Sequence, residues 1–448
     1  MSKQIRIKKG LDLKLAGSAE KKTESFNLKN YALKPTDFHG LFPKLMVRVG
    51  DKVKAGSPVF FDKYRDNIIF TSPVSGIIKD VIRGEKRKML EIRIESDGAD
   101  SYEAFKQADP KSLKKEEVIE QMLKSGVWPL IRQRPYNVIA NPNDNPKSIF
   151  ITGFDTAPLA ADMDYLLQGK EKEFQTAVDA LSVISDAKVY LNLGPDSKAP
   201  AFINAKGVEI NHFSGPHPAS NVGIQIHHID PINKGDIIWT LNAADMVTIG
   251  SLFMEGKYNP EKVIALVGSE VKKPQYYKVK AGVEVGAILK DQLAQDHVRI
   301  ISGNVLTGTR IDPSGYLSYY HHQISVIPEG DVYEFFGWLV PSPKKHSFYR
   351  TAFSWLTPNK VYKPNTNMNG GERAFVFTGA LEKVLPMDIL PIQLMKSIMV
   401  EDIDQMEQLG IYEVDEEDFA LCEYISTSKI DMQKLVRKGL DMMRVEMS

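Results

Sequence analysis

Three histidines and one aspartate between Phe213 and Gly256 are the side chains of this sequence most suited to binding a metal ion. They are His217, His227, His228 and Asp230. The stretches Ile224–Ile229 and Ile237–Leu241 are rich in β-branched residues, which predicts two short strands. Adjacent residues of a strand point to opposite faces, so His227 and His228 could not reach one ion. We therefore predict no metal site and expect hydrogen-bonded structural histidines.

A second candidate site alternates arginines with aromatic residues. Trp128, Arg132, Arg134 and Tyr136 lie within nine residues of one another. Such a group could clamp a flat ligand that carries carbonyl groups, through stacking and charge-assisted hydrogen bonds. The alternative is an interdomain clasp in which the guanidinium groups cap carbonyl oxygens.

A third group is apolar and aromatic. It comprises Phe335, Phe336 and Trp338 within the run Phe335–Pro341. Aromatic side chains are enriched at the centres of interfaces, so this run could be a docking surface. We interpret it instead as part of the core.

The last eighty residues fit the spacing of iron–sulfur ligands but lack the cysteines. Bacterial ferredoxins hold clusters with Cys-x2-Cys-x2-Cys-x3-Cys-Pro. Placed on this chain, that spacing falls on Phe375, Thr378, Leu381 and Leu385, and again on Glu416, Phe419, Cys422 and Ser426. One cysteine cannot hold a cluster, so we predict a helical ferredoxin-like domain without clusters, with a helix at Glu401–Leu409. A helical tail that fits the spacing by chance is the alternative. Cys422 is expected to be a small buried hydrophobe.

Four structural units are expected to position these residues. Residues 1–105 alternate apolar and polar side chains between Gly turns, as in the barrel-sandwich of biotinyl and lipoyl carrier domains. Lys63 lies near the position of a carrier lysine, but we expect an ordinary surface lysine. Residues 106–147 form a connector with a helix at Ser112–Lys124.

Residues 148–260 alternate strands and helices, which predicts a Rossmann-like parallel α/β domain. Strands are expected at Ile149–Ile151, Val189–Leu193 and Val208–Phe213, with a helix at Glu173–Ser185. A dinucleotide site would need Gly-x-Gly-x-x-Gly after the first strand. Gly153 stands alone there, so NADH or flavin binding by this domain is not expected.

The remaining residues complete a multidomain α/β and β fold. Residues 261–343 resemble a soluble-ligand-binding β-grasp (SLBB-like) domain, with strands at Arg299–Ser302 and Ile324–Pro328. Residues 344–372 are expected to be a long loop, of the kind that is functional or ordered by a partner. Residues 373–448 form the ferredoxin-like helical domain.

Composition excludes several classes of protein. The 448 residues contain 57 basic and 57 acidic side chains, so nothing points to nucleic-acid binding. A single cysteine rules out an intramolecular disulfide. No apolar run reaches the roughly 18 residues of a membrane span, and no signal peptide is expected.

Several long phrases carry a family resemblance. They are GPHPASNVGIQIHHIDP, IWTLNAADMVTIGSLF, RIISGNVLTGTR, FFGWLVPSP, LPMDILP and LGIYEVDEEDFALC. Through them the chain resembles the A subunit (NqrA) of the sodium-translocating NADH:quinone oxidoreductases (Na+-NQR), over nearly its whole length. It is also similar to the C subunit of the Rnf complex, in which the C-terminal cysteines are present.

The resemblance implies a peripheral component at the cytoplasmic face of the bacterial inner membrane. Its complex oxidises NADH, reduces ubiquinone or menaquinone and pumps sodium, with flavins and iron–sulfur centres on other subunits. The membrane-embedded B subunit is the implied partner. The chain is expected to hold no cofactor of its own and either to contact quinone or to act purely as an assembly scaffold. We take the residues Trp128–Tyr136, Phe335–Trp338, His217 and His227 as candidates for the quinone contact or an interface.

Overall fold

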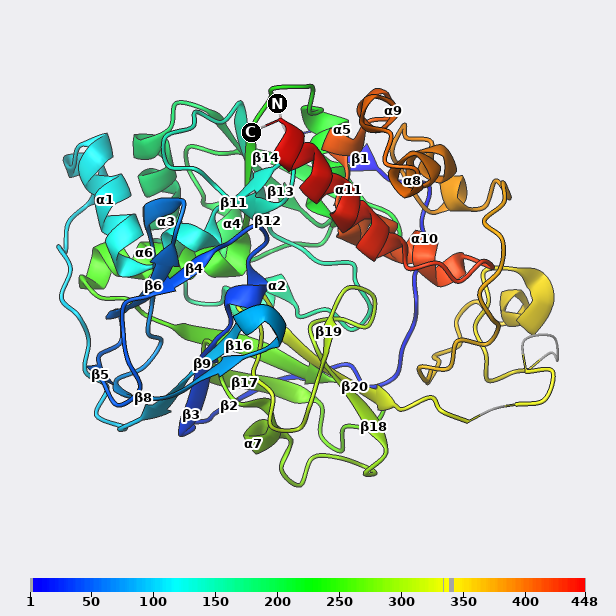
Figure 1. The fold of residues 1–448 in the computed structure, drawn as a ribbon, viewed down its shortest axis with the longest axis horizontal. Coiled ribbons are helices and arrows are strands. Elements are labelled where there is room, and N and C mark those ends of the chain that lie inside the picture. The colour runs from blue at the N-terminus through cyan, green and yellow to red at the C-terminus, as the bar shows by residue number, and fades with distance from the viewer. Residues whose placement is uncertain (1–2, 333, 338–341, 448) are drawn as a thin grey trace.

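Four β-sheets and eleven α-helices build the chain (Figure 1). The computed structural model describes residues 3–332, 334–337 and 342–447. These α-helices, strands and sheets are counted within those ranges.

The N-terminal unit consists of two small antiparallel sheets packed over an apolar core. One sheet has the order β3-β9-β8-β5 and the other β4-β6-β7. The strands are β3 (Asn30–Leu33), β4 (Pro43–Leu45), β5 (Lys52–Val53), β6 (Pro58–Asp62), β7 (Arg65–Thr71), β8 (Gly76–Arg83) and β9 (Met89–Ser96).

A seven-stranded sheet of order β1-β14-β13-β12-β15-β10-β11 forms the centre of the α/β unit. The first five strands in this order are parallel, and β10 and β11 extend the edge in antiparallel fashion. The strands are β1 (Gln4–Arg6), β10 (Arg132–Arg134), β11 (Val138–Ile139), β12 (Ser148–Thr152), β13 (Lys188–Leu193), β14 (Glu209–Ser214) and β15 (Ile238–Asn242). The predicted parallel sheet is therefore present.

Helices cover both faces of this sheet, as a parallel sheet requires. They are α1 (Lys115–Ser125), α2 (Met163–Leu166), α3 (Glu171–Ile184), α4 (Pro200–Ile203), α5 (Val222–Ile229) and α6 (Ala243–Glu255). The helix predicted at Glu173–Ser185 corresponds to α3, which buries Phe174, Ala177, Val178, Leu181 and Ile184.

Successive residues of β12 enter different cores because side chains alternate along a strand. Ile149 and Ile151 pack in the core that contains α3 and α6. Phe150 packs in a second core, which contains α5 and the C-terminal helices. The C-terminal helices therefore cover part of one face of the α/β sheet.

These C-terminal helices lie beside α5 and β1 in Figure 1. They are α8 (Pro391–Met399), α9 (Ile403–Gln408), α10 (Ala420–Ile425) and α11 (Met432–Glu446). The helix predicted at Glu401–Leu409 corresponds to α9. Residues 342–377, shown in yellow to orange, contain only two turns of 3-10 helix, η5 (Arg350–Ala352) and η6 (Ser354–Leu356).

The remaining sheet has the order β19-β18-β20-β16-β17-β2. Its strands are β2 (Glu20–Ser25), β16 (Glu261–Val267), β17 (Gln275–Lys280), β18 (Val298–Ser302), β19 (Thr309–Ile311) and β20 (Gln323–Pro328), with α7 at Val285–Leu289. Both β1 and β2 thus pair outside the N-terminal unit, so the first 25 residues add one strand to each of two other sheets.

One prediction of secondary structure is wrong. The residues Ile224–Ile229, expected to form a strand, belong to helix α5. β-Branched residues favour strands only weakly, and here the apolar side chains Val222, Ile224 and Ile226 are buried against the sheet and the C-terminal helices. Tertiary packing overrides the local preference.

The close approach of α3 and α6 depends on Gly250. A Cβ atom at this position would lie 1.8 Å from the carbonyl oxygen of Glu173, which is backbone and cannot swing away. We expect Gly250→Ala to separate the two helices and to lower the free energy of unfolding by about 1–3 kcal/mol. Gly371→Ala is the control, since a Cβ there meets nothing within 4 Å. Urea unfolding of both variants measures the effect, and equal midpoints would contradict the packing argument.

Candidate functional site

A polar cavity of about 110 Å³ lies where the α/β unit, the six-stranded sheet unit and the C-terminal helices meet. Thr152 and Asn242 line it from the ends of β12 and β15. His217, Asn304 and Glu417 line it from three loops or turns. We call it the switch-point cavity.

Its position follows from the topology of the sheet. The chain runs from β12 outward to β13 and β14, then returns to place β15 on the other side of β12. In open α/β sheets, ligands bind outside the carboxyl ends of the strands at the point where the strand order reverses. The cavity occupies that point.

Arg132 and His217, two of the sequence candidates, line this cavity together. The guanidinium carbon of Arg132 lies 4.9 Å from the centre of the Tyr320 ring, so the aromatic face holds the cation. The Nδ1 atom of His217 lies 3.1 Å from the Thr156 hydroxyl, and its backbone N–H donates to Asp12. The structure brings together residues 85 positions apart in sequence.

Burial keeps the His217 imidazole neutral. It lowers the pKa of His217 to about 4, so at neutral pH one ring nitrogen donates and the other accepts. Thr240 also lines this cavity, and its hydroxyl is buried without a hydrogen-bond partner among the described residues. Leaving such a group unpaired costs about 1–3 kcal/mol unless a water or a ligand bonds it.

Arg134 lies outside the cavity, in a buried ion network that joins β10 to the C-terminal unit. Its Nη2 atom lies 2.9 Å from Glu417 and 3.3 Å from Asp415. Burial alone would raise the pKa of Asp415, but Arg134 overcomes this and holds it well below its usual range. Arg134 thus bridges two units, but its partners are carboxylates and not the carbonyl oxygens that the clasp hypothesis named.

Trp128, Tyr136 and His227 also make structural contacts. The indole N–H of Trp128 donates to the carbonyl of Ala140 at 2.8 Å. Tyr136 packs edge-on against Tyr412 of the C-terminal unit. The Nδ1 atom of His227 lies 2.9 Å from a carboxylate oxygen of Glu413. These three side chains tie the connector and α5 to their neighbours.

The four groups considered for a metal have separate surroundings. His228 lies on helix α5 beside His227, and its Nδ1 atom bonds the carbonyl of Ile224, whereas Asp230 pairs with Lys147 and Ser148. Within the residues that the structure describes, no three His, Cys, Asp or Glu side chains are grouped to hold a metal ion.

The core interpretation of the Phe335–Pro341 run is wrong for its first two residues. Phe335 is 89% exposed and Phe336 is 49% exposed. An apolar run with aromatics resembles a buried strand in sequence, but Phe335 and Phe336 lie in a turn at the surface after β20. Trp338 lies outside the described residues.

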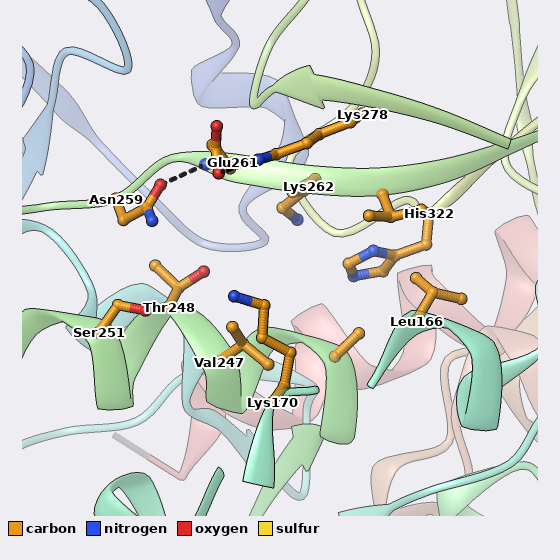
Figure 2. A pocket seen from close by; sticks show the side chains of 12 residues that line it. Leu166, Lys170, Val247, Thr248, Ser251, Asn259, Glu261, Lys262, Lys278 and His322 are labelled. Carbon is orange, nitrogen blue, oxygen red and sulfur yellow. Dashed lines mark hydrogen bonds and ion pairs between the residues drawn. The ribbon is translucent and has the colours of Figure 1, made fainter. Parts of the chain in front are cut away.

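A second cavity, shown in Figure 2, lies between α6 and strands β16 and β17. Lys262 and His322 line it, and both contact Asp245 at 3.1 Å. Burial would raise the pKa of Asp245, but Lys262 and His322 hold it well below its usual range. Sequence analysis missed this buried triad because its members lie far apart in the chain and belong to no motif.

Comparison with known proteins covers nearly the whole chain. Family models match residues 5–97 (NqrA N-terminal barrel-sandwich hybrid domain), 113–258 (NqrA second alpha/beta domain) and 263–312 (NQRA C-terminal domain). The chain is 38% identical to the A subunit of the Na(+)-translocating NADH-quinone reductase of Neisseria meningitidis serogroup B, over 99% of this chain and 100% of that one.

The chain belongs to this NqrA family of reductase subunits. The corresponding protein of a Marinomonas species is 35% identical over 98% of this chain and 99% of its own. Among solved structures, an NAD+-reducing [NiFe]-hydrogenase in the air-oxidized state covers 75% of this chain and 62% of its own, at 10% identity and a TM-score of 0.38.

The family models confirm three expected units of the fold: the barrel-sandwich, the α/β domain and the SLBB-like domain. The ferredoxin-like character of the C-terminal helices stays a prediction. Lys63 lies exposed in the two-residue turn between β6 and β7, with its amino group above the Tyr64 ring.

Several positions that matched cluster ligands are core residues in this family member. Leu381, Leu385, Phe419 and Cys422 lie in the second apolar core. Burial raises the pKa of the Cys422 thiol, which confirms the expected small buried hydrophobe. The other positions differ: Ser426 is buried, Phe375 is partly buried, Thr378 is exposed, and Glu416 pairs with Arg437.

Removing Arg134 should weaken the attachment of the C-terminal unit. We expect Arg134→Ala to lower the free energy of unfolding by about 3–5 kcal/mol, because the carboxylates of Asp415 and Glu417 would lose their buried partner. Arg132→Ala, two residues along the same strand, is the control and should cost far less. Chemical unfolding of the two variants tests this, and similar losses would contradict it.

His217 should make stability depend on pH. Its folded pKa of about 4 lies below the unfolded value near 6.5, so the unfolded state binds more protons between these values. Stability contributed by His217 is therefore complete above pH 6.5 and lost as the pH falls toward 4, by up to about 3 kcal/mol. Between pH 7 and pH 4 the free energy of unfolding should fall less for His217→Asn than for the parent chain. An equal fall in both chains would contradict the burial of a neutral imidazole.

Proposed function

We propose that this chain is a peripheral component of an Na+-pumping NADH:quinone reductase and that it carries no redox cofactor of its own. It works at the cytoplasmic face of the inner membrane, with the other subunits as partners and the membrane-embedded B subunit as the nearest of them. None of the described helices is long and apolar enough to span a membrane.

The residues around the expected cofactor positions do not fit those cofactors. The turn after β12 has the single glycine Gly153, and a Cβ there would meet the side chains of Leu193 and Phe202. This glycine serves internal packing, and the turn lacks the further glycines that let a backbone approach a pyrophosphate. One cysteine cannot ligate an iron–sulfur cluster. Both features support the proposal that the redox centres lie on other subunits.

The switch-point cavity supports a second part of this proposal, a contact with the quinone head group. Arg132 and His217 both offer donors to one small space, which Thr240 also lines. A quinone carries two carbonyl oxygens that accept such bonds. The single observation that carries the proposal is this convergence of donors at the point where the strand order reverses.

A pure assembly scaffold is the alternative function. It is favoured by the interdomain contacts of Arg134, Tyr136 and His227, which are three of the nine sequence candidates. On this view the chain binds no quinone and co-purifies tightly with the B subunit from solubilised membranes.

Calorimetric titration of the full chain with a short-chain, water-soluble quinone separates the two functions. We expect saturable binding that weakens about tenfold or more in Arg132→Ala, because a hydrogen bond from a charged donor is lost. Arg93→Ala is the matched control, since Arg93 also stacks on a tyrosine, Tyr316, in another part of the chain. The quinone contact would be refuted by a flat titration, or by Arg132→Ala binding quinone as tightly as the parent chain does. The scaffold function would then be the one supported.

A further inference from the structure

Residues 342–377 concentrate positive charge in a chain whose formal net charge is zero. They contain six basic side chains and one acidic side chain, Glu372. The basic residues are Lys344, Lys345, Arg350, Lys360, Lys363 and Arg373. This segment carries a net charge of +5, so the rest of the chain carries −5. Positive charge is therefore in local excess along this segment.

The same segment also exposes apolar side chains. Of the 23 large hydrophobic residues that are exposed among the described residues, eight lie in these 36 positions. Water-exposed apolar groups that gather in one region, and do not lie singly, mark an interaction surface. Figure 1 shows the segment at the edge of the molecule, beyond the strands of the six-stranded sheet.

A short tip presents three of these side chains together. Phe353 lies between η5 and η6 with a backbone φ of 56°, a left-handed conformation that bulky residues rarely adopt. Phe353 and Trp355 are each 51% exposed, and Leu356 is 61% exposed. The guanidinium group of Arg350 lies 5.1 Å from the centre of the Trp355 ring. Aromatic and cationic groups therefore share this tip.

The segment is attached firmly to the body of the protein. The buried Tyr362 forms backbone hydrogen bonds with Lys14 and Ala16 on either side of Leu15. His346 lies 3.0 Å from the hydroxyl of Tyr424 in the C-terminal unit. These contacts hold one side of the segment on the protein and leave the tip facing outward.

We infer that residues 342–377 dock on an anionic lipid surface, with the Phe353–Leu356 tip inserted at the headgroup level. Tryptophan, phenylalanine and leucine enter the interface between headgroups and acyl chains, and basic side chains are attracted to anionic lipids. The basic residues are spread along irregular backbone, which suits a diffuse negative surface better than a partner of one fixed shape. This inference extends the proposed peripheral location and is independent of the quinone contact.

Co-sedimentation of the purified full chain with vesicles tests this inference. Vesicles of phosphatidylcholine alone are compared with vesicles that also contain phosphatidylglycerol. We expect binding to the anionic vesicles to be at least about tenfold stronger and to fall as salt is raised, since salt screens exposed charges. Quinone is absent from the assay, so its outcome is separate from that of the titration.

Two combined variants locate the contact. Phe353→Ser with Trp355→Ser and Leu356→Ser removes the apolar tip. The charge variant combines Lys344→Gln, Arg350→Gln and Lys363→Gln. Each is expected to weaken binding to anionic vesicles about tenfold or more, because insertion and charge attraction act together.

Each variant has a matched control elsewhere on the surface. Phe42→Ser with Tyr64→Ser removes an exposed aromatic pair of the N-terminal unit. Lys86→Gln, Arg87→Gln and Lys88→Gln neutralise an exposed basic run there. Both controls should bind as the parent chain does, and circular dichroism checks that all the variants are folded.

Tryptophan emission gives a second measurement that does not depend on the variants of the tip. Trp128 and Trp239 are buried, so Trp355 reports the surface once Trp338→Phe has been introduced. We expect the emission to shift to shorter wavelength on anionic vesicles and to be quenched by brominated lipid. Absent or charge-independent vesicle binding, or variants of the segment that bind as the controls do, would overturn the inference and point to a protein partner.

Discussion

The structure depends on the need to bury both faces of one parallel sheet. Strand β12 sends Ile149 and Ile151 to one core and Phe150 to the other, so neither face can meet water. Helices α3 and α6 cover one face. The other is covered by α5 together with helices from the end of the chain, and β1 from its beginning pairs at the sheet edge. The ends of the chain are therefore part of the central α/β unit.

This arrangement explains why most of the conspicuous polar residues are structural. Because helices from the C-terminal unit cover one face of the sheet, fixed contacts are needed at the boundary between that unit and the α/β unit. Arg134, Tyr136 and His227 provide them. Charges removed from water must be paired, which is why the acidic run Asp415–Asp418 faces two arginines, Arg134 and Arg437. The same boundary leaves the switch-point cavity, where Arg132 and His217 keep free donor capacity.

This member of the reductase family has packing residues at the positions where a nucleotide or an iron–sulfur cluster would be expected. The α/β unit has the strand order of a nucleotide-binding sheet, yet its first turn contains a packing glycine in place of a phosphate-binding loop. The C-terminal unit has leucine, phenylalanine and a buried cysteine at positions spaced like cluster ligands. At both places the side chains form ordinary core. The two functional proposals accordingly concern the switch-point cavity and the surface of residues 342–377.

The sequence by itself determined the family, the α/β alternation and the inability to hold a cluster, because long phrases, apolar periodicity and a cysteine count are local properties. It also proposed the arginines of β10 and His217 as candidates. Only the tertiary structure decided that Arg132 faces a cavity while Arg134 is buried in an ion network, and that Ile224–Ile229 is helical. These outcomes depend on side chains brought from hundreds of residues away, such as Glu417 and Asp415, and no local pattern records them.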